Sequence, residues 1–362
     1  MVKDCLRERL QRGLSLVEIM IAMTVGLILL GGVFQVYSAS KQSYRVADNL
    51  SRMQENARFA MNILTRDIRM AGFVPCQATS NVANTLNSPN FYFDFFNGAV
   101  RGYEGGESTF PAELDAAVSG TDAIVVIRGG DDVYSLDNHQ PSNNAANFKI
   151  KGPHKFNDGD ILVICDTNQA SVFQTTNNNQ NNGTIVHNTG NVVSPGNCTK
   201  NLGSSGGATC SSGSFKSHTF APNSQLVKLE AAAYYIGQSV SGTTRSLYRR
   251  RLQITSSSTA EFKAEELVEG VENMQLLYGL DSNGDERADQ YVRAHQVVAP
   301  QSWNDVVTVR LGLLVHTLDN VAPDFDTASY SLPGAAIAAD GSDRRQRYVF
   351  TSTIKIRNRG LN

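Results

Sequence analysis

The sequence predicts an α+β fold in which one long N-terminal helix packs on a large antiparallel β-rich head. Three observations support this prediction. The run from Leu14 to Tyr37 is apolar, with one charge (Glu18) and no proline. Apolar residues then recur every three or four positions as far as Ile68. From Phe73 onward, short alternating segments are separated by stretches rich in Gly, Asn and Ser, a pattern typical of strands and turns.

The apolar run 14–37 is long enough to cross a bilayer as a helix, which needs roughly 20 residues. Residues 1–13 precede it as a positively charged leader. Because a positive flank stays on the cytoplasmic side, we expect the rest of the chain on the opposite side of the membrane. Secretory signals usually have an A-x-A cleavage site after the apolar region, and residues 33–40 contain no A-x-A sequence.

The junction between leader and apolar run reads Arg12-Gly13-Leu14-Ser15-Leu16-Val17-Glu18. It resembles the class III signal of type IV pilins and type II secretion pseudopilins. The resemblance implies cleavage between Gly13 and Leu14 by prepilin peptidase, followed by methylation of the Leu14 amine. It also implies that Glu18 acts in assembly by pairing with an N-terminal amine. A carboxylate in hydrocarbon costs about 2.5–3.5 kcal/mol, which favours a function for Glu18. The alternative is a signal anchor whose Glu18 lies at the membrane interface.

Residues 38–71 predict an amphipathic continuation of the same helix. One stripe is apolar, and charged residues lie mostly elsewhere around the helix. Gly72 provides a stop, and the first proline after the apolar run is Pro75. A helix over residues 14–71 would be roughly 85 Å long at 1.5 Å per residue. The stripe comprises Val46, Leu50, Met53, Ala57, Ala60 or Met61, Leu64 and Ile68.

Residues 72–362 form the predicted periplasmic head, as one domain or as two lobes. Its predicted strands are 123–129, 160–166, 171–176, 225–237, 246–253, 271–281, 306–319 and 347–359. The segment LVEGVENMQLL is compatible with a strand or a helix. Residues 177–191 and 203–214 are polar and rich in turn formers, so we expect surface loops there.

The five cysteines fit this organisation, because Cys5 lies in the leader and four remain in the exported part. An even number of cysteines in an oxidising compartment favours two disulfides. Four cysteines allow three connectivities. We favour Cys198–Cys210, which closes a Gly/Ser-rich loop, together with Cys76–Cys165, which ties the end of the helix to a strand.

Parts of the head resemble PilW-type minor pilins and, more weakly, the J-type minor pseudopilins of type II secretion. The resemblance lies in residues 60–76, 267–292, 303–317 and 349–358. It implies a structural subunit that helps initiate or cap type IV pilus assembly and supports twitching motility and adhesion. The implied partners are other minor pilins, the major pilin and a tip adhesin. The implied location is the inner membrane, with the head in the periplasm, and then the tip of the pilus.

Two other classes of function compete with this interpretation. The first is a minor pseudopilin that caps a short periplasmic filament. The second is a membrane-anchored enzyme or receptor that shares only the terminus of pilins. The sequence has no Walker loop, and its six histidines form no HExxH pair, so we do not expect an enzyme.

One loop has the composition of a calcium site. Asp281, Asn283, Asp285 and Asp289 place oxygen-bearing side chains at alternate positions, as in half of an EF-hand loop. Gly284 and Val292 depart from that motif. The alternative is a turn between strands that end at Leu280 and begin near Tyr291. Calcium is the only cofactor that the sequence suggests.

Nucleic acid is not expected as a partner. Arg249–Arg251 and the Arg344, Arg345 and Arg347 cluster are basic, but alternation along a strand divides each cluster between two faces. The net charge is −2, and removing the leader, which has four positive and two negative residues, makes it −4. A negative net charge disfavours binding to nucleic acid.

Overall fold

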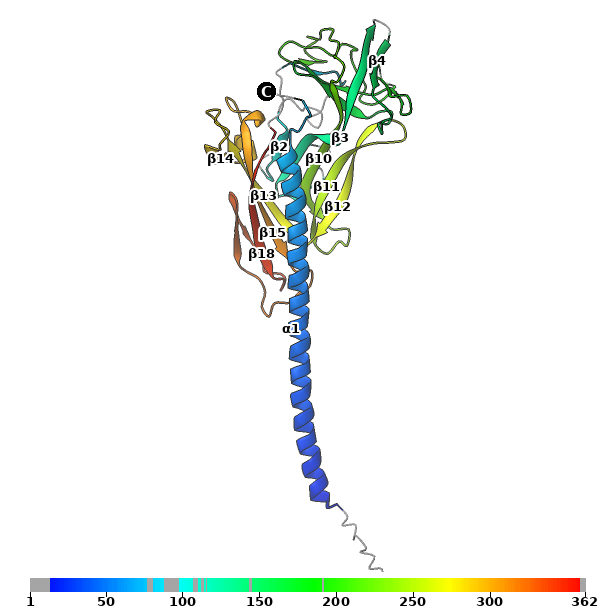
Figure 1. Cartoon of the computed structure of the whole chain (residues 1–362). Helices are drawn as coiled ribbons and strands as arrows, with labels where there is room; N and C mark the ends of the chain where they lie inside the picture. Colours follow the sequence, from blue (N-terminus) through cyan, green and yellow to red (C-terminus); the bar gives the residue numbers. More distant parts are fainter. Residues whose placement is uncertain are drawn as a thin grey trace, which may run out of the picture. The chain divides into compact units, whose positions relative to one another are not determined.

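The computed structural model describes residues 14–76, 81–87, 98–106, 110–111, 114, 116–142, 145–190 and 192–358. The chain divides into two compact units, Met1–Ser51 and Arg52–Asn362, which we describe separately. Figure 1 shows the single long helix and the β-rich head.

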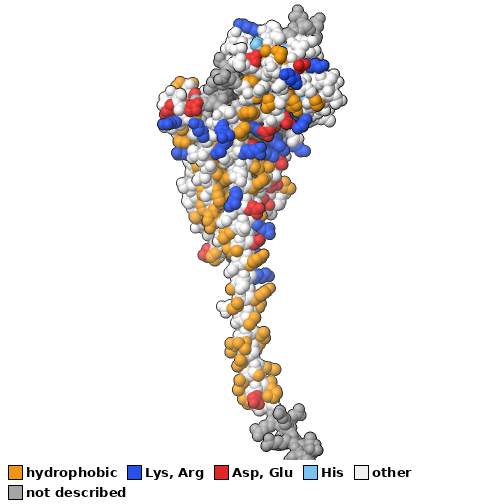
Figure 2. Space-filling view, in the orientation of Figure 1, with side chains coloured by type: hydrophobic (Ala, Val, Ile, Leu, Met, Phe, Trp, Pro, Cys, Tyr) orange, Lys and Arg blue, Asp and Glu red, His pale blue; other side chains and the backbone are white. Residues whose placement is uncertain are grey.

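Helix α1 spans Leu16–Met70. Within the first unit its side chains are almost all exposed, and none of its most apolar 18-residue window is buried. Figure 2 shows hydrophobic side chains along this part of the helix. By length and composition this segment is able to cross a membrane.

Within the second unit, the end of α1 packs on the head through the predicted stripe. Met53, Ala57, Ala60, Leu64 and Ile68 are each at most 3% exposed. The helix ends where the chain turns at a glycine with φ of +75°, as the sequence indicates at position 72. This part of the prediction is confirmed, because the long helix packs against a mostly antiparallel β head.

The larger sheet of the head has 12 strands among the described residues. Its main path is β7-β8-β4-β3-β10-β5-β6-β1-β9, and β2, β11 and β12 pair beside it. Strand β10 is central, because it pairs with β3, β5 and β11. The strands are β1 (Val82–Asn84), β2 (Val100–Tyr103), β3 (Ala123–Ser142), β4 (Ala145–Ile150), β5 (Ile161–Cys165), β6 (Ala170–Gln174), β7 (Asn177–Asn179), β8 (Thr184–Val186), β9 (Ala208–Thr209), β10 (Gln225–Gln238), β11 (Arg245–Ile254) and β12 (Ala260–Glu269).

The second sheet, which we call the C-terminal sheet, has the antiparallel order β14-β13-β15-β18. Within residues 271–355, a hairpin of β16 and β17 and two short 3₁₀ helices accompany it. The elements are β13 (Val271–Leu280), β14 (Gln290–Val292), η3 (Ala294–Gln296), η4 (Trp303–Asp305), β15 (Val306–His316), β16 (Ser329–Leu332), β17 (Ala335–Ala338) and β18 (Arg347–Lys355).

The part of the larger sheet built from residues 131–224 has its own core, and we call it the disulfide lobe. Its buried aromatic residues include Phe148, Phe156, Phe173 and Phe220. A separate core lies under β3, β5, β6 and β10. Both cores lie against the same continuous sheet. This region of the head is therefore not divided into two sheets.

One expectation from the sequence needs correction, and one open alternative is decided. The segment 177–191 is not only a surface loop, because β7 and β8 pair and Ile185 and His187 are buried. The segment 267–277, which was compatible with a strand or a helix, forms the end of β12 and the start of β13, on either side of Gly270. The β7–β8 hairpin was not recognised in the sequence because its composition is polar. Its composition is polar because only one face of the hairpin is covered.

Candidate processing and assembly site

The first turn of α1 is closed by Ser15 and Glu18. The Glu18 backbone N–H donates to the Ser15 hydroxyl at 3.2 Å, and the Ser15 backbone N–H donates to Glu18 Oε2 at 3.2 Å. The Ser15 hydroxyl also donates to Glu18 Oε2 at 3.3 Å. This reciprocal capping box satisfies two amide groups that a helix start leaves without partners. The carboxylate therefore lies over the helix N-terminus, where the helix dipole favours negative charge.

The other processing residues are adjacent. Leu14 is exposed and directly precedes the cap, whereas Gly13 and the leader lie outside the described residues. The carboxylate of Glu18 is thus held on the turn that begins at Leu14. Sequence reasoning placed Glu18 one turn from this position, but it did not identify Ser15 as the group that orients it.

Hydrogen bonds fasten the end of α1 to the head. The Asn56 side-chain amide donates to the Glu269 carbonyl at 3.2 Å. The Tyr234 hydroxyl donates to the Asp67 carboxylate, and burial together with this carboxylate raises the pKa of Tyr234 above its usual value. The Arg357 N–H donates to the Arg69 carbonyl at 3.0 Å. These polar contacts fix how the amphipathic stripe rests on the sheets.

The structure joins Cys76 to Cys165 and Cys198 to Cys210, the same pairs that the sequence favours. In both pairs the Cα atoms are 6.0 Å apart, a normal spacing for a disulfide. The first links the segment after α1 to β5, and the second closes a loop of the disulfide lobe. Cys165 is fully buried, so the first bond is part of a core.

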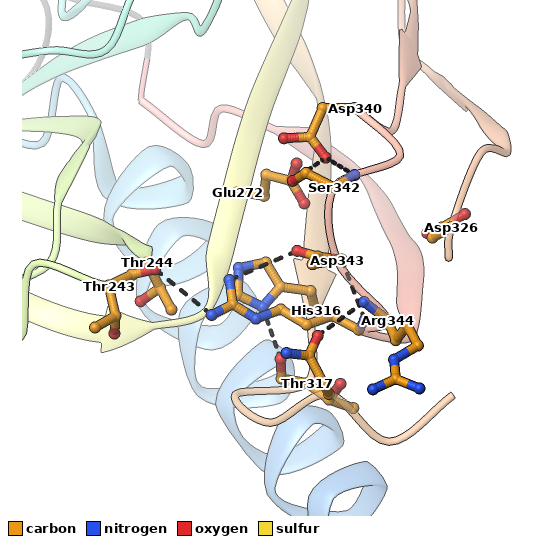
Figure 3. A network of polar contacts seen from close by, with 12 residues as sticks. Thr243, Thr244, Glu272, His316, Thr317, Asp326, Asp340, Ser342, Asp343 and Arg344 are labelled. Atoms are coloured by element: carbon orange, nitrogen blue, oxygen red, sulfur yellow. Dashed lines mark hydrogen bonds and ion pairs between the residues drawn. The ribbon is translucent and has the colours of Figure 1, made fainter. Parts of the chain in front are cut away.

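A buried arginine holds the start of β18. The Arg347 side chain is 3% exposed, and its Nε donates to Glu272 of β13 at 2.6 Å. Its other nitrogens contact Asp326 at 3.1 Å and Asp343 at 2.9 Å. Figure 3 labels these three carboxylates, Glu272, Asp326 and Asp343, among the polar side chains of this region. Burial acts to lower the pKa of Arg347, but Asp343 and Glu272 outweigh it and raise the pKa above its usual value, so the side chain stays charged.

The basic clusters are therefore largely committed to internal contacts. Arg347 is buried in the network just described. Arg249 and Arg251 share the carboxylate of Glu265, at 3.0 and 3.3 Å. Asp131 and Asp132 lie in β3 and pair with Arg128 and Lys155.

The loop with the calcium-like sequence is closed by its own hydrogen bonds. Asp281 is 4% exposed, and its carboxylate accepts backbone N–H groups from Asn283, Gly284 and Glu286 at 3.2, 2.7 and 2.9 Å. Asp289 accepts the Ser282 N–H at 2.8 Å. The loop joins β13 to β14, which pair from Leu280↔Gln290. Among the described residues no group of three or more His, Cys, Asp or Glu side chains is placed to hold a metal. Asn283 and Asp285 remain exposed on this loop.

A short motif that resembles a hydrolase signature has no matching context. Residues 203–207 read GSSGG, the spacing of a nucleophile elbow. That motif requires a serine at a strand-to-helix turn, beside a base. Ser205 instead lies in an exposed loop, where its hydroxyl accepts from Lys216 Nζ at 2.6 Å. This serine is therefore no candidate nucleophile.

Two family models match the chain at its two ends. The prokaryotic N-terminal methylation motif matches residues 9–34, across the capped start of α1. The family described as Type IV Pilus-assembly protein W matches residues 233–358, from the second half of β10 to the end of β18. Together they support a type IV pilin of the PilW type. No curated protein and no solved structure matches the chain.

The PilW-type match covers the C-terminal sheet and the β11–β12 hairpin, and it leaves the disulfide lobe outside. The two matches describe a structural component of the type IV pilus rather than an enzyme. The apolar helix and the methylation motif together suit a pilus component that is anchored in a membrane. They also point to pilus partners and to processing by prepilin peptidase.

Proposed function

We propose that residues 1–13 are a prepilin leader, removed between Gly13 and Leu14, with the new Leu14 amine methylated. The methylation-motif match over residues 9–34 supports this proposal, as does the helix that begins at Leu16. Residues 14–37 would span the inner membrane, and the head would lie in the periplasm. The Ser15 cap holds the Glu18 carboxylate where it can meet its own amine or that of a neighbouring subunit.

Processing is tested by the intact mass of the protein from cells with and without prepilin peptidase. We expect the wild type to begin at methylated Leu14, and Gly13→Val to keep the leader. Glu18→Ala should be cleaved but poorly recovered in sheared filaments. Ser15→Ala is the matched control for helix capping, because it keeps the carboxylate. A wild-type chain that retains Met1 would contradict the proposal.

We further propose that the PilW-type chain is a minor pilin that helps initiate or cap type IV pilus assembly. The observation that carries this proposal is the combination of a pilin helix with a head of nearly 290 residues. Such a head is difficult to repeat along a thin fibre but fits at its tip. Its partners would be the major pilin, other minor pilins and a tip adhesin.

The assembly role is tested by deleting the gene. We expect fewer surface pili and reduced twitching, while the major pilin stays processed and stored in the membrane. Complementation with the wild-type chain should restore both. Normal piliation together with a lost secretion of folded periplasmic proteins would instead indicate a minor pseudopilin of a type II secretion system.

Calcium at the 281–289 loop is a further proposal, with Asp285 and Asn283 as exposed ligands beside Asp281 and Asp289. It is tested by calorimetric titration of calcium into the full-length chain in detergent. Binding that Asp285→Ala abolishes would support the site. Heat changes that match a magnesium control would contradict it.

A further inference from the structure

Strand β18 is an edge of the C-terminal sheet, because β15 is its only ladder partner among the described residues. Two hydrogen bonds show which of its backbone groups face β15. The Ile356 N–H donates to the Val307 carbonyl, and the Gln346 carbonyl accepts from Thr317, both at 2.9 Å. Alternate residues of a strand turn their backbone groups to opposite sides. The backbone groups of Val349, Thr351 and Thr353 therefore face away from the sheet.

Nothing in the described part of the chain pairs with these outward groups. Past the end of β18, the Arg357 N–H bonds to the Arg69 carbonyl and marks where α1 covers the edge. Residues 348–354 contain no charge, proline or glycine. Proteins usually protect an edge strand with such residues. Strand β12, the hairpin edge of the larger sheet, shows this protection with exposed Glu261, Lys263 and Glu265.

An apolar groove of about 430 Å³ lies beside this edge, between α1 and β18. Its helix wall includes Met53 and Met61, and its strand wall includes Tyr348 and Phe350. The register with β15 places Tyr348 and Phe350 on one face, opposite Val315 and Leu313. Tyr348 is 50% exposed, although it lines the groove. Side chains of a strand added beside β18 would project into this space.

We propose that β18 accepts an extended strand from a neighbouring pilin subunit, which completes the C-terminal sheet and fills the groove beside α1. This inference rests on the proposed function. The unpaired backbone decides the kind of occupant: an extended segment satisfies the edge N–H and C=O groups, whereas a helix would fill the groove and leave them unpaired. Pairing supplies affinity, and the groove selects an apolar side chain in the added strand.

The test is hydrogen–deuterium exchange of the full-length processed chain in detergent, alone and co-purified with the minor pilins of the same organism. Exchange is read at single amides. In the free chain, the amides of Val349, Thr351 and Thr353 should exchange fast. Those of Phe350, Ser352 and Ile354, which face β15, should be protected. In the complex, we expect at least tenfold slower exchange at the outward amides and no change at the inward ones.

Variants separate backbone pairing from side-chain effects. Thr351→Pro removes an outward N–H and leaves the ladder to β15, so it should lower recovery of the complex at least tenfold. Thr351→Ala is the matched control and should bind as the wild type does. Met61→Trp fills the groove and should also weaken binding. Fluorescence of Trp303, the only tryptophan of the wild type, reports whether the two Thr351 variants fold, and circular dichroism reports it for Met61→Trp.

The outcomes distinguish this inference from the proposed function. A complex in which the outward amides stay fast, or in which Thr351→Pro binds normally while folded, overturns strand addition and leaves the minor-pilin role intact. A chain that neither binds a pilin nor affects piliation overturns both.

Discussion

The C-terminal sheet and the disulfide lobe reach stability in different ways. The sheet packs on α1, lies within the PilW-type match, and contains no cysteine. Its buried polar side chains include Arg347, which contacts three carboxylates. The disulfide lobe lies outside that match and contains three of the four disulfide cysteines, namely Cys165, Cys198 and Cys210.

The difference follows from what each region has to pack against. A sheet covered by a helix buries apolar surface over its whole length, and burial is the main stabilising term in folding. The lobe is built from short strands and turns without a helix in its described part, so covalent links offset the shortage of regular packing. The comparison predicts that the two regions respond to different perturbations.

The largest effect should come from Arg347→Ala. Removal of this buried cation leaves Glu272, Asp326 and Asp343 close together without their common partner. We expect a loss of about 3–5 kcal/mol in the free energy of unfolding, the range for breaking a buried ion pair. Urea unfolding followed by Trp303 fluorescence measures this loss. The fluorescence reports on the C-terminal sheet because the ring centroids of Trp303 and Tyr278 of β13 are 4.9 Å apart.

The matched control is Arg344→Ala, three positions earlier, where the side chain is exposed. It should change the free energy of unfolding by less than about 0.5 kcal/mol. Equal losses in the two variants would show that the network does not stabilise the C-terminal sheet.

Removing the Cys198–Cys210 bond should affect the lobe and spare the sheet. The loop between these cysteines spans 12 positions, and the chain-entropy relation gives a loss of about 3 kcal/mol at most. Limited proteolysis of Cys198→Ala/Cys210→Ala should show early cleavage in residues 199–209. The Trp303 transition should move little, and a shift as large as that of Arg347→Ala would remove the distinction between the regions.

Acid should weaken the lobe before the sheet. Burial lowers the pKa of His139 to about 4 and that of His187 to about 3, below the usual 6.5. The unfolded chain therefore binds more protons than the folded chain below pH 6.5, and stability falls as the pH drops from 6.5 toward 4. For each histidine the effect is on the order of 2–3 kcal/mol.

At the contact between Asp122 and the C-terminal sheet, stability should depend on pH in the opposite direction. Asp122 accepts the Leu276 N–H of β13 at 2.8 Å, and burial raises its pKa to about 7. Between pH 3.8 and 7 the folded chain keeps a proton on Asp122 that the unfolded chain has lost. The free energy of unfolding therefore falls as the pH rises through this range. In His187→Phe, the stability of the lobe, measured by amide exchange, should fall less as the pH drops from 6.5 toward 4. In Asp122→Asn, stability should fall less as the pH rises from 3.8 to 7. An unchanged pH profile in both variants would contradict these assignments.

The smallest effect should come from Lys355→Ala at the far end of β18. Its amine is 3.8 Å from Glu286, and both side chains are more than half exposed. Exposed pairs contribute about 0–1 kcal/mol, and salt screens them. The urea midpoint should hardly change. A loss of free energy of unfolding as large as that of Arg347→Ala would contradict this prediction. It would mean that exposure does not explain why the Lys355 and Arg347 ion pairs differ in strength.

Much of the fold could be predicted from local patterns. The helix was expected over residues 14–71 and spans Leu16–Met70. Strands with long apolar runs, such as β5 and β15, were also predictable because burial on both faces leaves a continuous signal. The β7–β8 and β16–β17 hairpins were not predicted, since short strands that are half covered by polar residues resemble turns.

By itself, the sequence determined the membrane-length helix, its junction at Gly13 and Leu14, and the position of Glu18, because these depend on residues that are neighbours along the chain. Only the tertiary structure decided what surrounds Arg347, which carboxylates share it, and which edge of the C-terminal sheet stays open beside α1. Glu272 and Arg347 are 75 positions apart, and Met61 and Tyr348 are still further apart. No periodic pattern reports such distances, because long-range pairing depends on how whole elements pack.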